Sequence, residues 1–131
     1  MIVVDSSAIV AILAKEPEGP DFVSAIRRAD QAAVSAVNVL ETGMVLRARS
    51  GTEGVGDFFD LLAALDVVVA PFGVDDCHLA LAAFHRFGKG IHPKARLNLG
   101  DCAAYALAKR LNAPLLFKGD DFTHTDIEAC R

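Results

Sequence analysis

The chain has 131 residues, the length of one domain, and this is enough to bury a hydrophobic core. Hydrophobic residues make up 53% of the sequence and the net charge is −4, which excludes intrinsic disorder and a protein that coats nucleic acid by bulk positive charge. No apolar run approaches the roughly 20 residues of a membrane-spanning helix. We therefore expect one soluble, cytoplasmic domain over residues 1–131, with no membrane contact.

The cysteines also favour a reducing compartment. Cys77, Cys102 and Cys130 are odd in number and form no Cys-x-x-Cys pair, which argues against a disulfide framework and against a structural zinc site. We expect free thiols. The opening residues 1–5 carry no basic segment, so they do not resemble a secretory signal peptide.

Short apolar, β-branched runs alternate with longer helical runs along the chain. A strand is expected at residues 2–5, then a helix at 6–14, a break at Pro17 and Pro20, a helix at 21–29 and a strand at 32–36. Helices follow at 37–50 and 52–65 on either side of Gly51, then a strand at 67–70, a helix at 75–87, a polar stretch, a helix at 100–111 and a strand at 115–117. This alternation is typical of an α/β domain with a parallel sheet, whose sites lie beyond the carboxyl ends of the strands.

Two acidic residues occupy positions where the pattern predicts burial. Asp5 ends a strand that should be covered on both faces, and its ordinary role would be to cap the next helix. Glu41 has apolar helical neighbours at positions 37, 44 and 45, which predicts that it faces inward. A buried Glu41 would need a cation, a metal ion or a raised pKa, and the alternative is an edge position with its carboxylate in water.

Further carboxylates are expected near the same edge of the sheet. Asp101 opens the helix at 100–111 and begins an apolar stripe, although an acid in a first turn often only stabilises the helix. Asp120 and Asp121 follow the last strand, where an acidic pair commonly forms a turn. Together these acids predict a site for a hard divalent ion, Mg²⁺ or Mn²⁺, and therefore metal-assisted phosphoryl transfer.

A basic segment precedes the helix at 100–111. Residues 77–100 contain no Asp or Glu, and the cations and histidines among them could hold a phosphate backbone or form a solvated loop. They include His85, Arg86, Lys89, His92, Lys94 and Arg96. Lys118 could contact phosphate or neutralise Asp120, and the sequence does not choose between these roles.

Four motifs resemble those of PIN-domain ribonucleases, specifically the VapC-type toxins of type II toxin–antitoxin pairs. The resemblance covers nearly the whole chain and is carried by the segments IVVDSSAIVAIL, VLETGMVL, LNLGDCAAYALAKRL and LLFKGDDF. It implies a single PIN-like domain at 1–131, a three-layer α/β fold with a short parallel sheet flanked by helices.

The resemblance also implies an acidic centre that binds Mg²⁺, with Mn²⁺ able to replace it. Asp5, Glu41 and Asp101 match the family's first three carboxylates, which serve as catalytic residues and metal ligands. Many relatives have threonine, a basic residue and aspartate after the last strand, but here glycine stands at the acidic position. Asp120 or Asp121 is expected to supply the fourth carboxylate, or the centre works with three.

The implied activity is endonucleolytic cleavage of RNA, often tRNA or ribosomal RNA, by a homodimer that a cognate VapB-type antitoxin inhibits within a toxin–antitoxin hetero-oligomer. Substrate contacts are expected from Ser7, Arg86, Lys89 and Lys118. Two alternatives are a non-catalytic binding module and, less favoured, an aspartate-dependent phosphatase or receiver domain. The phosphatases require a second aspartate two residues after Asp5, where this chain has serine.

Overall fold

A four-stranded parallel sheet forms the centre of the protein, which a computed structural model describes over residues 1–130. The strand order is β3-β2-β1-β4, and every neighbouring pair runs parallel. The strands are β1 (Ile2–Val4), β2 (Ala32–Ser35), β3 (Val67–Ala70) and β4 (Leu115–Leu116). The predicted α/β class with a parallel sheet is therefore confirmed.

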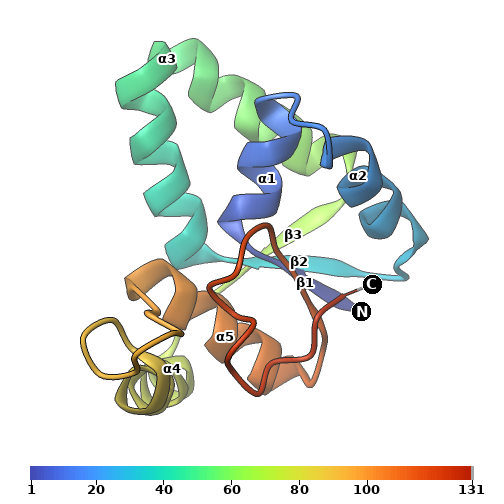
Figure 1. The fold of residues 1–131 in the computed structure, drawn as a ribbon. Coiled ribbons are helices and arrows are strands. Elements are labelled where there is room, and N and C mark those ends of the chain that lie inside the picture. Colours follow the sequence, from blue (N-terminus) through green and yellow to red (C-terminus); the bar gives the residue numbers. More distant parts are fainter. Residues whose placement is uncertain (131) are drawn as a thin grey trace.

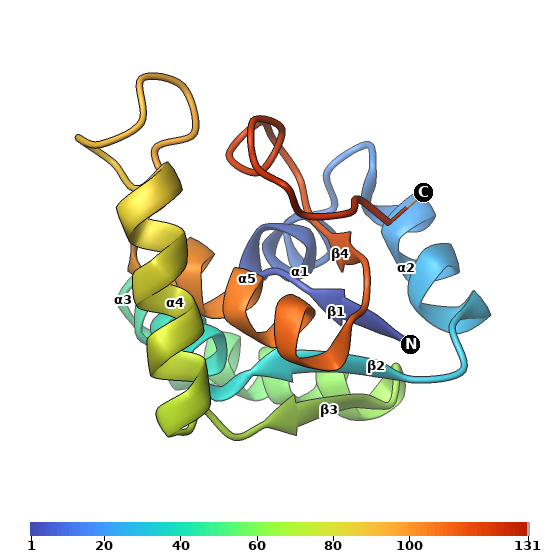
Figure 2. The ribbon, with the colours of Figure 1, turned by 90° about the horizontal axis from the view of Figure 1, so that it is seen from below.

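Helices cover both faces of the sheet (Figure 1). Helices α1 (Ser6–Leu13), α2 (Gly19–Arg28) and α3 (Ala36–Ala64) lie on one side, and α4 (Val74–Phe87) and α5 (Leu99–Leu111) lie on the other. Figure 2, turned by 90°, shows α4 and α5 in front of the strands. None of the helices within residues 1–130 combines the length and the apolarity needed to cross a membrane.

The alternation of side chains along the strands divides the interior into two hydrophobic cores. Val3 and Ala33 point into the core that contains most of α5, while Val4 and Val34 point into the core below α1 and α3. Both faces of β1, β2 and β4 are buried, so these strands are almost continuously apolar, as in other covered parallel sheets, whereas Val68 and Val69 of the edge strand β3 are exposed. The polar residues that follow the strands are thereby confined to the sheet edge.

Two boundaries in the N-terminal half depend on proline and glycine. Helix α2 begins at Gly19 rather than at residue 21, because Pro20 is accommodated in the first turn, where its missing N–H has no helical partner. The two helices predicted at 37–50 and 52–65 are both present, and they meet at a kink inside the element labelled α3. Gly51 marks the bend with φ 67° and ψ −164°, a conformation essentially confined to glycine.

Candidate active site

The carboxyl ends of β1 and β4 meet at the point where the strand order changes direction. The chain leaves β1 toward β2 on one side, whereas β4 pairs with the other side of β1. Ligand sites of open parallel sheets form at this kind of switch point. Asp5 follows β1 directly, and we use the term acidic centre for Asp5, Glu41, Asp101 and Asp121.

Asp5 is buried, with 4% of its surface exposed. Its Oδ2 accepts hydrogen bonds from the backbone N–H of Ser7 at 3.0 Å and from the Ser7 hydroxyl at 2.5 Å. Burial raises the pKa of Asp5, the hydrogen bonds from Ser7 oppose this shift, and repulsion from Asp121 adds to it. Asp5 therefore caps α1 and also places a carboxylate at the sheet edge.

Asp101 lies in the first turn of α5 and forms a capping box with Asn98. The Asn98 Oδ1 accepts from the Asp101 N–H at 2.9 Å, and the Asp101 Oδ2 accepts from the Asn98 N–H at 3.1 Å. Burial raises the pKa of Asp101 to about 7, and repulsion from Asp5, Asp121 and Glu41 contributes to the shift. The four carboxylates of the acidic centre are therefore close enough to interact.

Glu41 is exposed, so the prediction that it faces the interior is wrong. The buried stripe of α3 at this level is formed by Asn38 and Thr42, while Met44 is 66% exposed on an open apolar surface. The apolar helical neighbours of Glu41 therefore belong to an exposed apolar surface and not to the hydrophobic core. Its carboxylate nevertheless lies against the first turn of α5, because a Cβ added at Gly100 would overlap it.

The loop after β4 brings Asp121 rather than Asp120 toward the other acids. Both residues are exposed, but the repulsion that acts on Asp5 and Asp101 comes from Asp121. Phe122 is 3% exposed and its ring lies 5.1 Å from that of Phe117, which anchors the loop beside the sheet. Asp120 was the fourth catalytic carboxylate in our expectation, and Asp121 was its alternative.

The acidic centre provides oxygen donors for a hard cation. Within residues 1–130, no three side chains of His, Cys, Asp or Glu are grouped tightly enough to ligate one ion. Mg²⁺ is commonly held by only one or two carboxylates while water completes its shell, and Asp5 with Asp101 matches that pattern. Ser6 Oγ, next to Asp5 in the sequence, and Asn38 Oδ1 are buried without hydrogen-bond partners within residues 1–130.

Two of the basic residues expected to bind substrate are engaged in ion pairs. Arg86 NH1 lies 3.6 Å from Asp126 Oδ2, and its guanidinium lies 4.6 Å from the centroid of the Phe87 ring. Lys118 pairs with Glu16 and Glu18, which lie between α1 and α2. Lys118 therefore links two loops, a role that the sequence did not suggest.

Lys89 belongs to a closed loop that we call the basic loop, residues 88–97. The Lys89 N–H donates to the Leu97 carbonyl at 2.9 Å and the Leu97 N–H to the Phe87 carbonyl at 2.9 Å. Inside the loop, His92 Nδ1 accepts two backbone N–H groups at 2.9 and 3.0 Å. The side chains of Lys89, Lys94 and Arg96 are exposed on a fixed frame that leads directly into α5.

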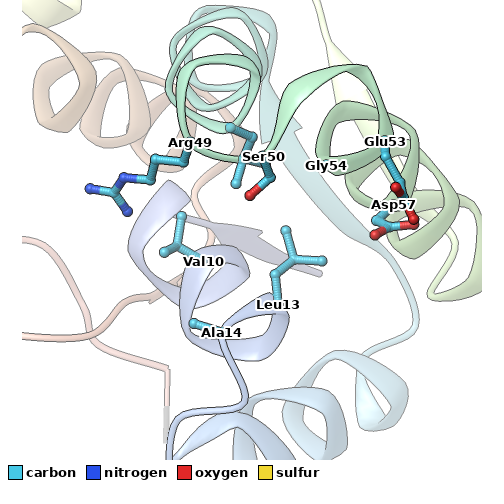
Figure 3. A pocket seen from close by; sticks show the side chains of 9 residues that line it. Val10, Leu13, Ala14, Arg49, Ser50, Glu53, Gly54 and Asp57 are labelled. Atoms are coloured by element: carbon cyan, nitrogen blue, oxygen red, sulfur yellow. The ribbon is translucent and has the colours of Figure 1, made fainter.

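A separate pocket lies between α1 and the bend of α3 (Figure 3). It has a volume of about 350 Å³ and is lined by residues such as Val10, Leu13, Arg49 and Asp57. In Figure 3 the carboxylates of Glu53 and Asp57 lie together, and Arg49 points away from them. No residue that we predicted for the active site lines this pocket.

Asn38 is a residue of this region that the sequence analysis missed. Its side chain is 1% exposed and its Nδ2 donates to the Gly100 carbonyl at 3.0 Å. The available signal was an amide three residues before Glu41, within an otherwise apolar stretch. Buried amides require partners, so this position could have been singled out.

Comparisons with known proteins agree with this geometry. The PIN domain family model matches residues 2–128. Ribonuclease VapC30 of Mycobacterium tuberculosis is 44% identical over 129 residues, which cover 96% of this chain and 95% of that protein.

Solved structures share the fold at low sequence identity. VapC20 of Mycobacterium tuberculosis, described as a toxin that cleaves the sarcin–ricin loop, superimposes with a TM-score of 0.77 at 16% identity, covering 97% of this chain and 96% of that one. A toxin–antitoxin complex from Klebsiella pneumoniae gives a TM-score of 0.71 at 15% identity, covering 96% and 93%. The chain therefore belongs to the PIN-domain family and, within it, to the VapC-type ribonucleases.

Proposed function

We propose that this single-domain chain is the toxin of a toxin–antitoxin pair and cleaves RNA as a divalent-metal-dependent endoribonuclease. The observation that carries the proposal is the pair of buried acids Asp5 and Asp101. They lie at the sheet switch point, and burial raises the pKa of both. The third buried acid within residues 1–130, Asp76, pairs with Arg110 at 2.7 Å, whereas neighbouring acids repel Asp5 and Asp101.

Asp5 and Asp101 would hold Mg²⁺ or Mn²⁺, with Glu41 binding through water or directly. When bound, the ion would neutralise the carboxylates and polarise the phosphodiester group. Asp121 is exposed and adjacent, so we assign it the task of accepting a proton from the attacking water. Asp120, our first expectation for this task, is the alternative.

The basic loop would hold the RNA backbone beside the acidic centre. Lys89 is exposed there with Lys94 and Arg96, on the segment that enters α5. Arg86 would contribute only by exchanging its ion pair with Asp126 for a phosphate, and Lys118 only by leaving Glu16 and Glu18. Ser7 would act mainly through Asp5. The RNA class we favour is tRNA or ribosomal RNA.

A VapB-type antitoxin is the proposed protein partner, bound to a homodimer of this chain. The support is the similarity to VapC relatives and to a toxin–antitoxin complex. Exposed apolar residues of α3 and of the edge strand β3 offer surface for either contact, since Leu40 and Met44 of α3 are each 66% exposed and Val69 of β3 is 42% exposed.

The test is RNA cleavage by the full chain with Mg²⁺ or Mn²⁺, and with EDTA. Asp5→Asn and Asp101→Asn should each reduce the cleavage rate at least about 100-fold while the fold is retained. Asp60→Asn, a change at an exposed acid of α3, should cleave like the wild type. Cleavage that survives both EDTA and Asp101→Asn would refute the metal-dependent nuclease.

A chain that binds RNA but never cleaves it would instead be a non-catalytic PIN-like module. Titration of the purified protein with Mn²⁺ separates the two functions. Binding that Asp101→Asn abolishes supports the nuclease, and no carboxylate-dependent binding supports the module.

A further inference from the structure

A buried amide connects the first turns of α3 and α5. Asn38 donates from Nδ2 to the carbonyl oxygen of Gly100, 62 residues away in the sequence, at 3.0 Å. The donor is 1% exposed. A hydrogen bond shielded from water in this way holds its partners more firmly than one at the surface.

The peptide group that Asn38 holds is the one that begins Asp101. The Gly100 carbonyl and the Asp101 N–H belong to the same planar unit. Asn38 holds the oxygen of that unit, and Asn98 Oδ1 accepts from its N–H at 2.9 Å. The plane is therefore fixed at both ends, and with it the starting point of the Asp101 side chain.

The same turn of α3 places Glu41 against Gly100. Asn38 and Glu41 are separated by three residues, so they lie on adjacent parts of one helical surface. A Cβ at Gly100 would overlap the Glu41 carboxylate, which shows how closely the two helices approach. The hydrogen bond from Asn38 to Gly100 thus helps to set the separation between Glu41 and Asp101.

We propose that Asn38 is a positioning residue, which holds the first turn of α5 so that Asp101 and Glu41 face one shared ion. The consequence for catalysis rests on the nuclease function proposed above. Asn38 touches neither the reacting atoms nor the ion in this role and acts through the Gly100–Asp101 peptide.

The oxygen of the Asn38 amide limits what this side chain is expected to contribute to stability. Because Nδ2 must face the Gly100 carbonyl, Oδ1 points elsewhere, and it is buried without a partner within residues 1–130. An unsatisfied buried acceptor is costly, and an apolar side chain of similar shape removes this cost together with the hydrogen bond. We therefore expect Asn38→Leu to change the melting temperature by less than about 5 °C.

The test compares Asn38→Leu with Ser35→Ala in the full chain. Ser35 is the buried last residue of β2, and its Oγ accepts from the Val37 N–H at 3.3 Å as the N-cap of α3. Its loss should lower stability without changing the Gly100 contact. Three readouts are needed: Mn²⁺ affinity by electron paramagnetic resonance, kcat and KM for RNA, and amide hydrogen exchange at residues 101–103.

Asn38→Leu should weaken Mn²⁺ binding and lower kcat by about 10- to 100-fold, as the loss of a group that orients a metal ligand does elsewhere. KM should stay within about threefold, and exchange at residues 101–103 should accelerate. Ser35→Ala should match the wild type in all of these. The proposal is overturned if Asn38→Leu binds Mn²⁺ and turns over like the wild type, or if Ser35→Ala reproduces its losses.

A second variant and a second readout complete the test. Should Asn38→Leu not fold, Asn38→Ser makes the same test, because its shorter hydroxyl does not reach the Gly100 carbonyl. Should even the wild type neither bind Mn²⁺ nor cleave RNA, the nuclease proposal fails by itself. Hydrogen exchange then still decides the role of Asn38, and unchanged exchange at residues 101–103 in the variant refutes it.

Discussion

The hydroxyl of Ser7 joins Asp5 to the loop after β4. It donates to Asp5 Oδ2 at 2.5 Å and accepts from the backbone N–H of Lys118 at 3.0 Å. The two segments are 111 positions apart in the sequence. A hydroxyl with its proton committed to Asp5 serves first to fix that carboxylate, although the sequence suggested substrate binding.

Ser7→Ala should lower the free energy of unfolding by about 1–2 kcal/mol. The substitution removes the hydroxyl that accepts from the partly buried N–H of Lys118 and donates to the buried carboxylate of Asp5. Urea denaturation in EDTA measures this. Ser6→Ala is the matched control: Ser6 Oγ is buried without a partner in the described chain, so its removal should be neutral or slightly stabilising. Equal effects of the two variants would contradict the assignment of Ser7.

The metal-free protein should become more stable as the pH falls from 8 to 5. The pKa of Asp101 is about 7 in the fold, against an ordinary value of 3.8, so the folded state takes up a proton that the unfolded state does not. The stabilisation is complete below the unfolded value and is lost as pH rises through 7. Burial shifts the pKa of Asp5 in the same direction.

Urea unfolding in EDTA at several pH values gives this profile. Asp101→Asn should flatten it and should be the more stable protein at pH 8, because it removes a repelled charge while an amide oxygen can still accept from Asn98. Saturating Mn²⁺ should also flatten the wild-type profile. Parallel profiles for wild type and variant would contradict the raised pKa.

Gly100→Ala should impair the acidic centre more than it impairs the fold. The new Cβ would overlap the Glu41 carboxylate, which lies at the end of a flexible side chain and can swing away. We expect a stability loss of about 1 kcal/mol and at least a tenfold fall in kcat. Gly43→Ala, at a helical position with no atom within 4 Å of the new Cβ, should keep kcat and gain about 0.5–1 kcal/mol.

Gly51→Ala should be destabilising although the position is open. No atom lies within 4 Å of an added Cβ, but φ is +67°, and holding alanine there costs about 1–3 kcal/mol. The unfolding free energy and far-ultraviolet circular dichroism would show a less stable protein. If the variant were instead as stable as the wild type, the bend of α3 would not depend on this residue.

The strand and helix pattern could be predicted from the sequence because the central strands are largely apolar and because polar caps, glycine or proline mark many helix ends. Pro20 lies in the first turn of α2, and Gly73 and Gly88 cap the two ends of α4. The expected burial of Asp5 followed from the same pattern and is confirmed. Asp101 was singled out because it begins an apolar stripe, and it is buried as well. The apolar periodicity shows which acidic residues stand in buried positions, and the parallel strand arrangement then brings them to the edge of the sheet at the carboxyl ends of its strands.

The prediction for Glu41 failed for a physical reason. Helical spacing identifies an apolar surface but does not say whether another element covers it, and Met44 beside Glu41 is largely exposed. Contacts between segments that are distant in the sequence could not be predicted either. The ion pairs of Lys118 with Glu16 and Glu18, and the hydrogen bond from Asn38 to Gly100, depend on how the loops and helices pack.

The pairing of β4 with β1 has a consequence for the moment at which a newly made chain becomes active. Asp5 is translated first, but the partner strand of β1 and the loop that carries Asp121 come more than a hundred residues later. A nascent polypeptide that still has β4 inside the ribosome lacks both the partner strand on that side of β1 and the carboxylate of Asp121. The acidic centre can therefore form only after residue 121 has been translated and has left the ribosome.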